Sequence, residues 1–187
     1  MESFASEAKK LKAIITPLFE GKLDPRPHQL AAIVRLEKER LQLEQKKASS
    51  EKGKLPLVIL GQFGCGIGKS AILAVYAKYL ASLNSKSKVL VCTPSTWVTH
   101  QMSAHFQVTK LIEELSTCSG IFLFEHKRLA EVDEQQLKGT MLLVDEVDIL
   151  LANDELKARA LRAKTIIGLS ATLGGTVGLQ RYSDHFS

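Results

Sequence analysis

A glycine-rich turn that ends in a lysine and a serine is the part of this sequence best suited to chemistry. Gly64, Gly66 and Gly68 precede Lys69 and Ser70, between an apolar run and a segment with helical spacing. Glycines adopt positive φ and let backbone N–H groups approach phosphate oxygens. Lys69 would then face the β- and γ-phosphates of a triphosphate, and the Ser70 hydroxyl would ligate Mg²⁺. The pattern predicts a phosphate-binding loop, and the alternative is a strand-to-helix turn without a ligand.

The loop departs from the widespread phosphate-binding pattern at its start and in its centre. Phe63 stands five residues before Gly68, where the widespread pattern has glycine. Cys65 and Ile67 separate the three glycines, and we include both in the predicted nucleotide-binding stretch. A thiol donates hydrogen bonds more weakly than a hydroxyl, so Cys65 is expected to reduce phosphate affinity. Its place near a helix N-terminus also predicts sensitivity to oxidants, unless it serves only as a small residue.

Paired acids follow a second apolar run, in the segment MLLVDEVDILL. A carboxylate at the carboxyl end of a strand that lies beside the phosphate-loop strand can hold Mg²⁺, which is the role predicted for Asp145. Glu146 could polarise an attacking water as a general base, and Asp148 could couple the site to a later motif. Lys69, Asp145 and Glu146 are therefore candidate catalytic residues, and Ser70 and Asp145 are candidate metal ligands. The alternative is a polar turn after a buried strand.

Short apolar runs of the β type recur beyond residue 55, separated by segments long enough to form helices. The expected strands are residues 57–60, 88–92, 120–124, 140–144 and 165–168. These runs are continuous rather than alternating, as strands buried on both faces require. We therefore predict an α/β fold, a three-layer sandwich with a mainly parallel sheet, covered by helices on both sides and joined by right-handed crossovers.

Two helices are expected before the first strand. Apolar residues recur near helical spacing over residues 2–19, and Pro17 would end or bend that helix. Pro27 suits the first turn of a second helix, which would run through Leu36.

The segment 37–54 is charged and loses the apolar stripe, so we expect a solvated helix end followed by a flexible linker. A nucleic-acid patch is the less favoured interpretation of its lysines, which are Lys46, Lys47, Lys52 and Lys54. The chain is accordingly divided into an N-terminal helical part, residues 1–54, and an α/β domain, residues 55–187.

Composition limits the classes of partner. The chain has 187 residues and a formal net charge of +5, which mildly favours polyanions such as nucleic acid or ATP. Cys65, Cys92 and Cys118 lack metal-ligand spacing and indicate reduced thiols without a zinc site. There is neither a signal-peptide pattern nor an apolar run of roughly 18 residues. We therefore expect a cytoplasmic or nuclear protein without a membrane partner.

Between Arg26 and Leu173 the sequence resembles the N-terminal, RecA-like ATP-binding domain of superfamily two helicases of the DEAD/DEAH type. The glycine-rich turn is similar to the T-G-x-G-K-T variant of that family, with Cys65 in place of threonine. The resemblance implies a P-loop ATPase that uses ATP and Mg²⁺. It further implies that Gln29, in the run RPHQ, reads the adenine base and that Arg26 assists it.

Two further motifs follow in the order that the family has. In the run VLVCTPSTWVTHQ, the resemblance implies contacts to a nucleic-acid backbone from Thr93, Pro94, Ser95 and Gln101. In the run GLSATL, three residues match the S-A-T motif, which couples ATP hydrolysis to movement between lobes. They are Ser170, Ala171 and Thr172.

The chain also differs from the family. Ser95 and Thr96 stand where arginine is common, so a charged phosphate contact is missing. Trp97 is expected to be buried rather than to stack on a base. The tail beyond Thr172 is too short for a second RecA-like lobe, whose arginine contributes roughly 10³ to 10⁵ in rate in related enzymes. We therefore expect ATP binding with very slow turnover unless a second lobe acts in cis or in trans.

Two other functions stay open. The run VDEVDILL also resembles the SecA motor lobe, which moves polypeptide, although no segment is long enough for the polypeptide-contacting insertion of such a motor. A non-catalytic interaction module that binds a nucleotide without turnover is the third interpretation.

Overall fold

Five parallel strands form one sheet in the computed structural model, which describes residues 4–19, 25–48, 56–106 and 109–173. The strands lie in the order β1-β5-β4-β2-β3, and each neighbouring pair is parallel. Their bounds are β1 Leu57–Gln62, β2 Lys88–Thr93, β3 Gly120–Glu125, β4 Met141–Asp145 and β5 Thr165–Ser170. The prediction of an α/β fold with a parallel sheet is confirmed. The two ends of each predicted strand lie within two residues of the ends of the observed strand.

Helices precede and connect the strands. The longer ones are α1 Phe4–Ile15, α2 Pro27–Ala48 and α3 Lys69–Leu83. The shorter ones are α4 Thr96–Ser103, α5 Glu134–Leu137, α6 Val147–Leu151 and α7 Asp154–Ala160, with 3-10 turns η1 Thr16–Phe19, η2 Ile112–Ser116 and η3 His126–Glu131. The two expected N-terminal helices are present, and the first changes to a 3-10 turn beside Pro17. Among the described helices, none combines the length and apolar character that a membrane span needs.

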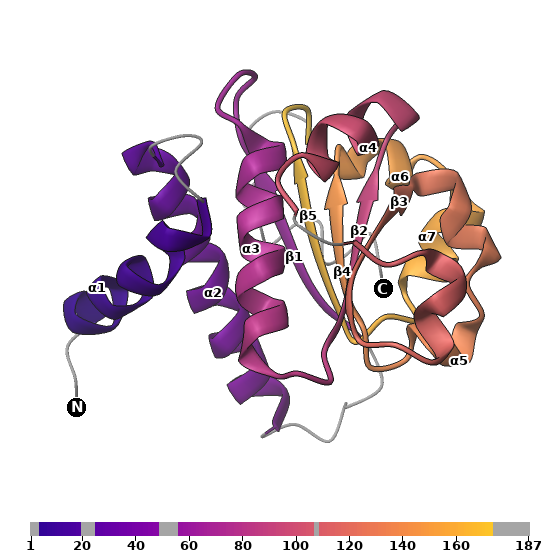
Figure 1. Cartoon of the computed structure of the whole chain (residues 1–187), viewed down its shortest axis with the longest axis horizontal. Helices are drawn as coiled ribbons and strands as arrows, with labels where there is room; N and C mark the ends of the chain where they lie inside the picture. The colour runs from indigo at the N-terminus through magenta and orange to yellow at the C-terminus, as the bar shows by residue number, and fades with distance from the viewer. Residues whose placement is uncertain (1–3, 20–24, 49–55, 107–108, 174–187) are drawn as a thin grey trace.

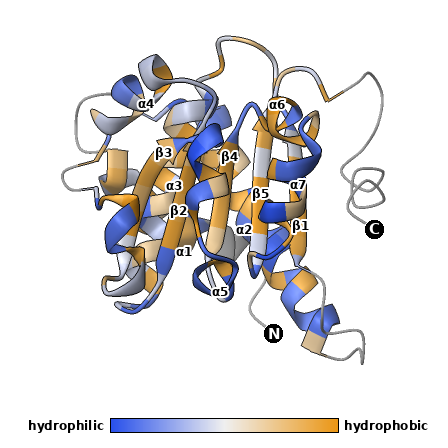
Figure 2. Ribbon diagram, turned by 90° about the vertical axis from the view of Figure 1, so that its right-hand side faces the viewer, coloured by the Kyte–Doolittle hydropathy of each residue, from blue (hydrophilic) through white to orange (hydrophobic). Residues whose placement is uncertain are grey.

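The helices cover both faces of the sheet and create two hydrophobic cores (Figure 1). α3 packs over β2 and β4, α2 packs over β1, and α1 packs against α2 and α3. The opposite core joins η3, α5, α6 and α7 to the sheet. Successive residues of one strand serve opposite cores, as Val91 and Cys92 do, so the strands are apolar along most of their length (Figure 2). Three layers result, as predicted.

The interpretation of residues 37–54 as a solvated end and linker was wrong for its first part. α2 continues to Ala48, and Glu37 and Arg40 on it are buried. Charged side chains can be buried when they pair and when their hydrogen bonds are complete. Glu37 accepts hydrogen bonds from Tyr76 and Tyr79 of α3 as well as from Arg40. Residues 49–54 lie outside the described residues, so the expected linker and the Lys52 and Lys54 positions stay predictions.

Candidate functional site

The phosphate-binding turn predicted from the sequence connects β1 to α3. Gly66 and Gly68 have φ of 77° and 84°, which glycine adopts without strain. Lys69 is the first residue of α3, so the backbone N–H groups of the first helical turn point toward the loop. A helix N-terminus of this kind attracts anions because its N–H groups lack intrahelical acceptors. Cys65 is exposed in the turn, and Ile67 is half-buried.

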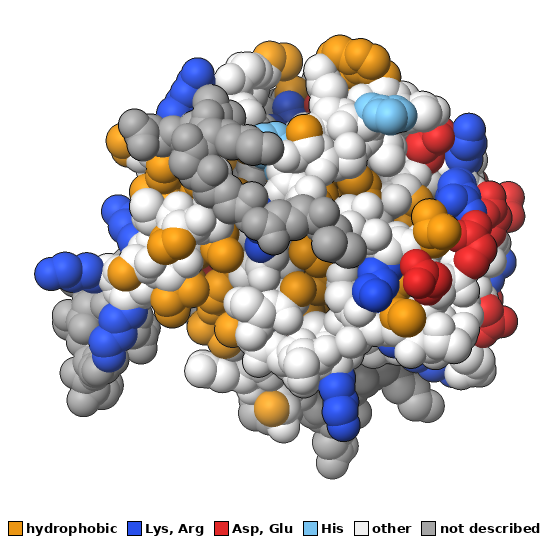
Figure 3. Space-filling model, viewed as in Figure 1, with side chains coloured by type: hydrophobic (Ala, Val, Ile, Leu, Met, Phe, Trp, Pro, Cys, Tyr) orange, Lys and Arg blue, Asp and Glu red, His pale blue; other side chains and the backbone are white. Residues whose placement is uncertain are grey.

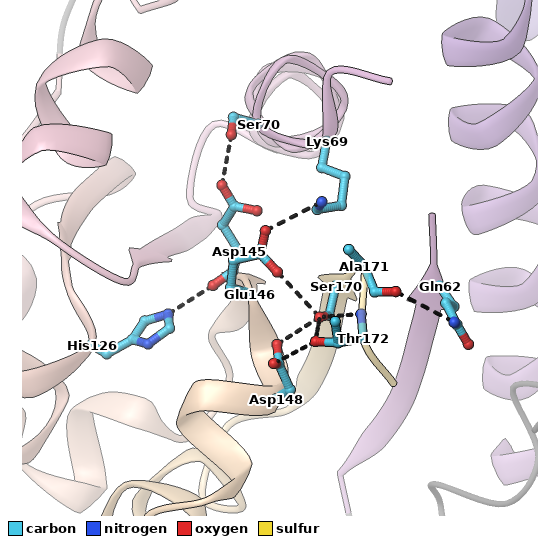
Figure 4. A network of polar contacts seen from close by, with 10 residues as sticks. All are labelled: Gln62, Lys69, Ser70, His126, Asp145, Glu146, Asp148, Ser170, Ala171 and Thr172. Atoms are coloured by element: carbon cyan, nitrogen blue, oxygen red, sulfur yellow. Dashed lines mark hydrogen bonds and ion pairs between the residues drawn. The ribbon is translucent and has the colours of Figure 1, made fainter. Parts of the chain in front are cut away.

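Four candidate residues from distant parts of the chain meet at the carboxyl ends of β1 and β4 (Figure 4). Ser70 donates a hydrogen bond of 2.6 Å to Oδ2 of Asp145. The Lys69 ammonium lies 3.2 Å from a carboxylate oxygen of Glu146. Both pairs are joined across 75 or more residues of sequence, because parallel strands bring their carboxyl ends to one edge. The structure thus brings together the residues that the two strongest motifs contribute.

Asp145 carries an incomplete set of hydrogen bonds. Its residue is 3% exposed, and its Oδ1 has no hydrogen-bond partner among the described residues. Burial raises the pKa of Asp145 above its ordinary value, while the hydrogen bond from Ser70 opposes that rise. A buried oxygen without a partner is costly unless a ligand or ion satisfies it. A carboxylate oxygen beside a serine hydroxyl is the ligand type that Mg²⁺ prefers, so Asp145 and Ser70 fit a magnesium ion.

Glu146 has a strained backbone. Its φ is 48° and its ψ is 60°, the left-handed region that side chains other than glycine rarely adopt. Strain of this kind costs on the order of 1–3 kcal/mol and is concentrated at functional sites. The conformation turns the chain between β4 and α6 and directs the Glu146 carboxylate between Lys69 and Ser170.

The predicted coupling residues form one hydrogen-bonded cluster with Glu146. Ser170, at the end of β5, lies within hydrogen-bond distance of Asp148 at 2.6 Å and of Glu146 at 3.1 Å. The Thr172 hydroxyl donates to Asp148 over 2.8 Å, and the Thr172 backbone N–H donates to Ser170. Burial alone would raise the pKa of Asp148, but the hydrogen bonds from Ser170 and Thr172 lower it below its ordinary value. The Ala171 carbonyl accepts from Gln62 of β1, so the cluster also reaches the strand before the loop.

Gln29 and its neighbours lie against the phosphate loop at the start of α2. The Gln29 amide donates to the Ile67 carbonyl and accepts from the backbone N–H of Arg26. The Arg26 side chain is exposed. His28, which the sequence analysis missed, has Nε2 3.1 Å from the same Ile67 carbonyl oxygen. Its place next to Gln29 in RPHQ was the signal that could have identified it.

His126 is a second residue that the sequence analysis missed. It follows β3, is 4% exposed, and its Nε2 lies 2.9 Å from the backbone carbonyl oxygen of Asp145. Burial lowers the pKa of His126 below its ordinary value, so the ring is neutral near pH 7. His126 therefore holds the end of β4 in place. No motif connects the two positions in the sequence, and β2 lies between the two strands that end there, so only the three-dimensional structure reveals the contact.

The candidate nucleic-acid residues lie at the end of β2 and on α4. Ser95 and Gln101 are exposed, whereas Thr93 is buried and its hydroxyl contacts Thr99. Ser95 caps α4 by accepting from the Val98 backbone N–H. Pro94 is half-buried between them. The prediction that Trp97 is buried was wrong: it is 68% exposed, because α4 packs on the core through Met102 instead.

The net positive charge is not gathered over the face that Figure 3 shows. Acidic and basic side chains lie next to one another on its right-hand side. Arg128 pairs with Glu113 and Glu131, and Lys127 pairs with Glu125 near α4. These pairs leave the exposed polar and aromatic side chains of α4 as the candidate contacts there.

Comparisons with known proteins bear on the family and the fold. A family model described as the AAA domain matches residues 45–168. None of the curated proteins compared with the chain matches it. A crystal structure of the UvsW helicase from bacteriophage T4 is similar with a TM-score of 0.59 and 17% identity, over 98% of this chain and 64% of that chain. A second T4 UvsW structure gives a TM-score of 0.55 and 16% identity, over 91% and 34% of the two chains.

A Sulfolobus solfataricus SWI2/SNF2 ATPase core in complex with dsDNA is similar with a TM-score of 0.54 and 15% identity. The match covers 81% of this chain and 32% of that chain. This chain therefore spans less than two thirds of the length of each of these structures. At such identities the likeness establishes the fold.

Proposed function

The chain belongs to the AAA domain family and has the RecA-like fold of superfamily two helicase ATP-binding domains. From this we propose that it binds Mg-ATP as one lobe of a helicase-type motor. The observation that carries the proposal is the meeting of Lys69 and Ser70 with Asp145 and Glu146 at one edge of the sheet. Oδ1 of Asp145 has no hydrogen-bond partner in the described part of the chain, which supports the proposal because a buried carboxylate oxygen needs a ligand.

Each residue of the loop then has a defined role. The backbone of Gly64, Cys65, Gly66, Ile67 and Gly68 would surround the phosphates, and Lys69 would exchange Glu146 for a phosphate oxygen. Ser70 and Asp145 would hold Mg²⁺, which neutralises charge on the phosphate oxygens when bound. Glu146, released from Lys69, would orient and deprotonate a water.

Coupling to movement is proposed for the cluster around Ser170. Asp148 and Thr172 bond to Ser170, which also reaches Glu146, so a change in Glu146 is passed to the segment after β5. Two similar structures are a helicase and a dsDNA-bound ATPase core, which supports nucleic acid as the partner. Ser95 and Gln101 would contact its backbone, and the exposed Trp97 would contact a base. A second RecA-like lobe, in cis or in trans, would supply the arginine that rapid hydrolysis requires.

Thermal unfolding with and without Mg-ATP tests nucleotide binding. A ligand at 100 times its dissociation constant stabilises the folded state by about 2.7 kcal/mol, so the midpoint should rise measurably. The Lys69→Ala variant should show little rise at the same concentration. Equal midpoints with and without Mg-ATP in the wild-type protein would contradict the proposal.

ATPase assays with a second lobe separate the three functions. Stimulation by single- or double-stranded nucleic acid is the expected result for a helicase-type lobe. Stimulation by unfolded polypeptide alone would favour the SecA-like motor. Nucleotide binding without stimulation by either polymer would favour a non-catalytic interaction module.

A further inference from the structure

Gln29 is the polar side chain most closely joined to the phosphate loop. It lies in the first turn of α2, is 7% exposed, and both ends of its amide are engaged. Oε1 accepts the backbone N–H of Arg26 over 3.1 Å, and Nε2 donates to the carbonyl of Ile67 over 3.2 Å. The amide therefore links the start of α2 directly to the residue before Gly68.

The Gly68 backbone lies directly beside this amide. A Cβ on Gly68 would lie 2.5 Å from Gln29 Nε2, so the glycine backbone and the amide are already in close contact. Gly68 also has φ of 84°, and it immediately precedes the first residue of α3. The amide thus fixes the position of the backbone that must surround the phosphates.

An amide that reads adenine must present its donor and its acceptor to the base edge together. Turning the Gln29 amide to do so would remove the hydrogen bonds to Arg26 N–H and Ile67 carbonyl. Near Gln29 in the described part of the chain, Arg26 and His28 are exposed, and His28 Nε2 lies 3.1 Å from the Ile67 carbonyl oxygen. A guanidinium and an imidazole can stack on the face of any base, and stacking distinguishes the bases poorly.

We propose that Gln29 is a positioning residue for the phosphate loop and that the site accepts nucleoside triphosphates without discriminating their bases. This inference rests on the proposed function, since it concerns the same nucleotide site. It replaces adenine reading by Gln29, which the resemblance to helicases implied, with a contact to the loop itself.

Competition for a fluorescent ATP analogue tests the inference on the whole chain. ATP, GTP, CTP and UTP, each with Mg²⁺, should displace the analogue at concentrations within roughly threefold of one another, because a threefold ratio is less than one hydrogen bond is worth. A preference for ATP of about tenfold or more would overturn the inference. Failure of the analogue and of every triphosphate to bind would overturn the proposed function as well, so the two failures are distinguishable.

The Gln29→Ala variant separates positioning from base reading. Its affinities for ATP, GTP and inorganic triphosphate should all fall by the same factor, about tenfold, because the loop is displaced for each ligand. A loss confined to ATP would instead identify Gln29 as a base reader and overturn the inference. The Gln135→Ala variant, in an exposed glutamine of α5, is the matched control and should leave all affinities unchanged.

Thermal unfolding of the Gln29→Ala variant excludes a general loss of structure as the cause. If that variant does not fold, the competition experiment with the wild-type protein still decides the inference, because the ratio of the affinities for ATP and for the other triphosphates is measured without any substitution.

Discussion

Two clusters of charged side chains, one between α2 and α3 and one at the phosphate loop, differ in how completely their hydrogen bonds are made. In the α2–α3 cluster, formed by Glu37, Arg40, Glu44, Tyr76 and Tyr79, each Glu37 oxygen accepts two hydrogen bonds. Burial raises the pKa of Tyr79 to about 12, with a further contribution from Glu37, so this phenol stays protonated and donates. Arg40 also pairs with Glu44 at 2.8 Å.

In the loop cluster, formed by Lys69, Ser70, Asp145 and Glu146, the set of hydrogen bonds is incomplete by comparison. Asp145 has a buried oxygen for which the described ranges of the chain offer no partner, and Glu146 has a left-handed backbone. A complete buried network stabilises one arrangement, whereas an incomplete one with local strain is suited to a ligand. We therefore infer that the first cluster stabilises the fold, whereas the second forms the proposed nucleotide site. Substitutions in the two clusters should therefore affect different measurements.

Removing Glu37 should give the largest change in stability. Glu37→Ala leaves the buried Arg40 with only the partly exposed Glu44, and breaking a buried pair in this way costs about 3 kcal/mol. Urea unfolding measures the loss, and Mg-ATP affinity should be unchanged while the protein is folded. Glu44→Ala is the control, and it should cost no more than about 1 kcal/mol. Equal losses from the two substitutions would show that Glu37 is not the centre of the cluster.

Removing Lys69 should produce the opposite pattern. Lys69→Ala should weaken Mg-ATP binding by roughly ten- to hundredfold, because a hydrogen bond to a charged group is worth about 1.5–3 kcal/mol. Its partner Glu146 is partly exposed, so the free energy of unfolding should change by less than about 1 kcal/mol. Calorimetry and urea unfolding measure the two quantities. A large loss of stability with intact affinity would place Lys69 with the structural cluster instead.

The effect of His126 should appear as a dependence of stability on pH. Because burial lowers its pKa, the unfolded chain takes up the proton before the folded protein does as the pH falls. The free energy of unfolding should therefore be highest above the ordinary histidine pKa and fall as the pH drops through that value, between roughly pH 7 and pH 5.5.

Urea unfolding of His126→Gln across this pH range isolates the contribution of that ring. The amide can still donate to the Asp145 carbonyl but does not titrate, so the fall should be smaller than in wild type. His100→Gln, at an exposed site on α4, should keep the wild-type slope. The same slope in wild type and in His126→Gln would contradict the assignment.

Trp97 should give the smallest change in stability. It is the only tryptophan of the chain and is 68% exposed, so Trp97→Ala should alter the free energy of unfolding by no more than about 0.5 kcal/mol. In wild type, a single-stranded oligonucleotide should quench its fluorescence, and the variant should bind that strand more weakly in a filter-binding assay. Unchanged fluorescence at saturating strand would remove Trp97 from the nucleic-acid surface.

The sequence predicted the features that depend on local pattern. Continuous apolar runs identified all five strands, and the glycines before Lys69 identified the loop at the end of β1. Burial of Glu37 and Arg40 could not be predicted, because it depends on tyrosines of another helix that complete their hydrogen bonds. The exposure of Trp97 could not be predicted for a similar reason, because Met102 is the residue of α4 that packs in the core.

The contacts between distant residues of the site likewise include some that the sequence predicted and some that it could not predict. Asp145 was predicted as a partner of the loop because its strand was expected to lie beside β1. That expectation of adjacent strands was wrong, since β5 lies between β1 and β4, but the carboxyl ends of the two strands are still close enough for Ser70 to reach Asp145. The His126 contact reaches from the end of β3 past β2 to the end of β4, and the sequence contains no spacing that fixes this strand order.

Calorimetric titration of ATP in the presence and absence of Mg²⁺, with wild type and Asp145→Ala, tests the central claim most directly. Mg²⁺ should strengthen binding to wild type by about tenfold or more, and this dependence should largely disappear in Asp145→Ala. The same Mg²⁺ dependence in both proteins would contradict the assignment of Asp145, and equal affinity in wild type, Asp145→Ala and Lys69→Ala would contradict the site as a whole.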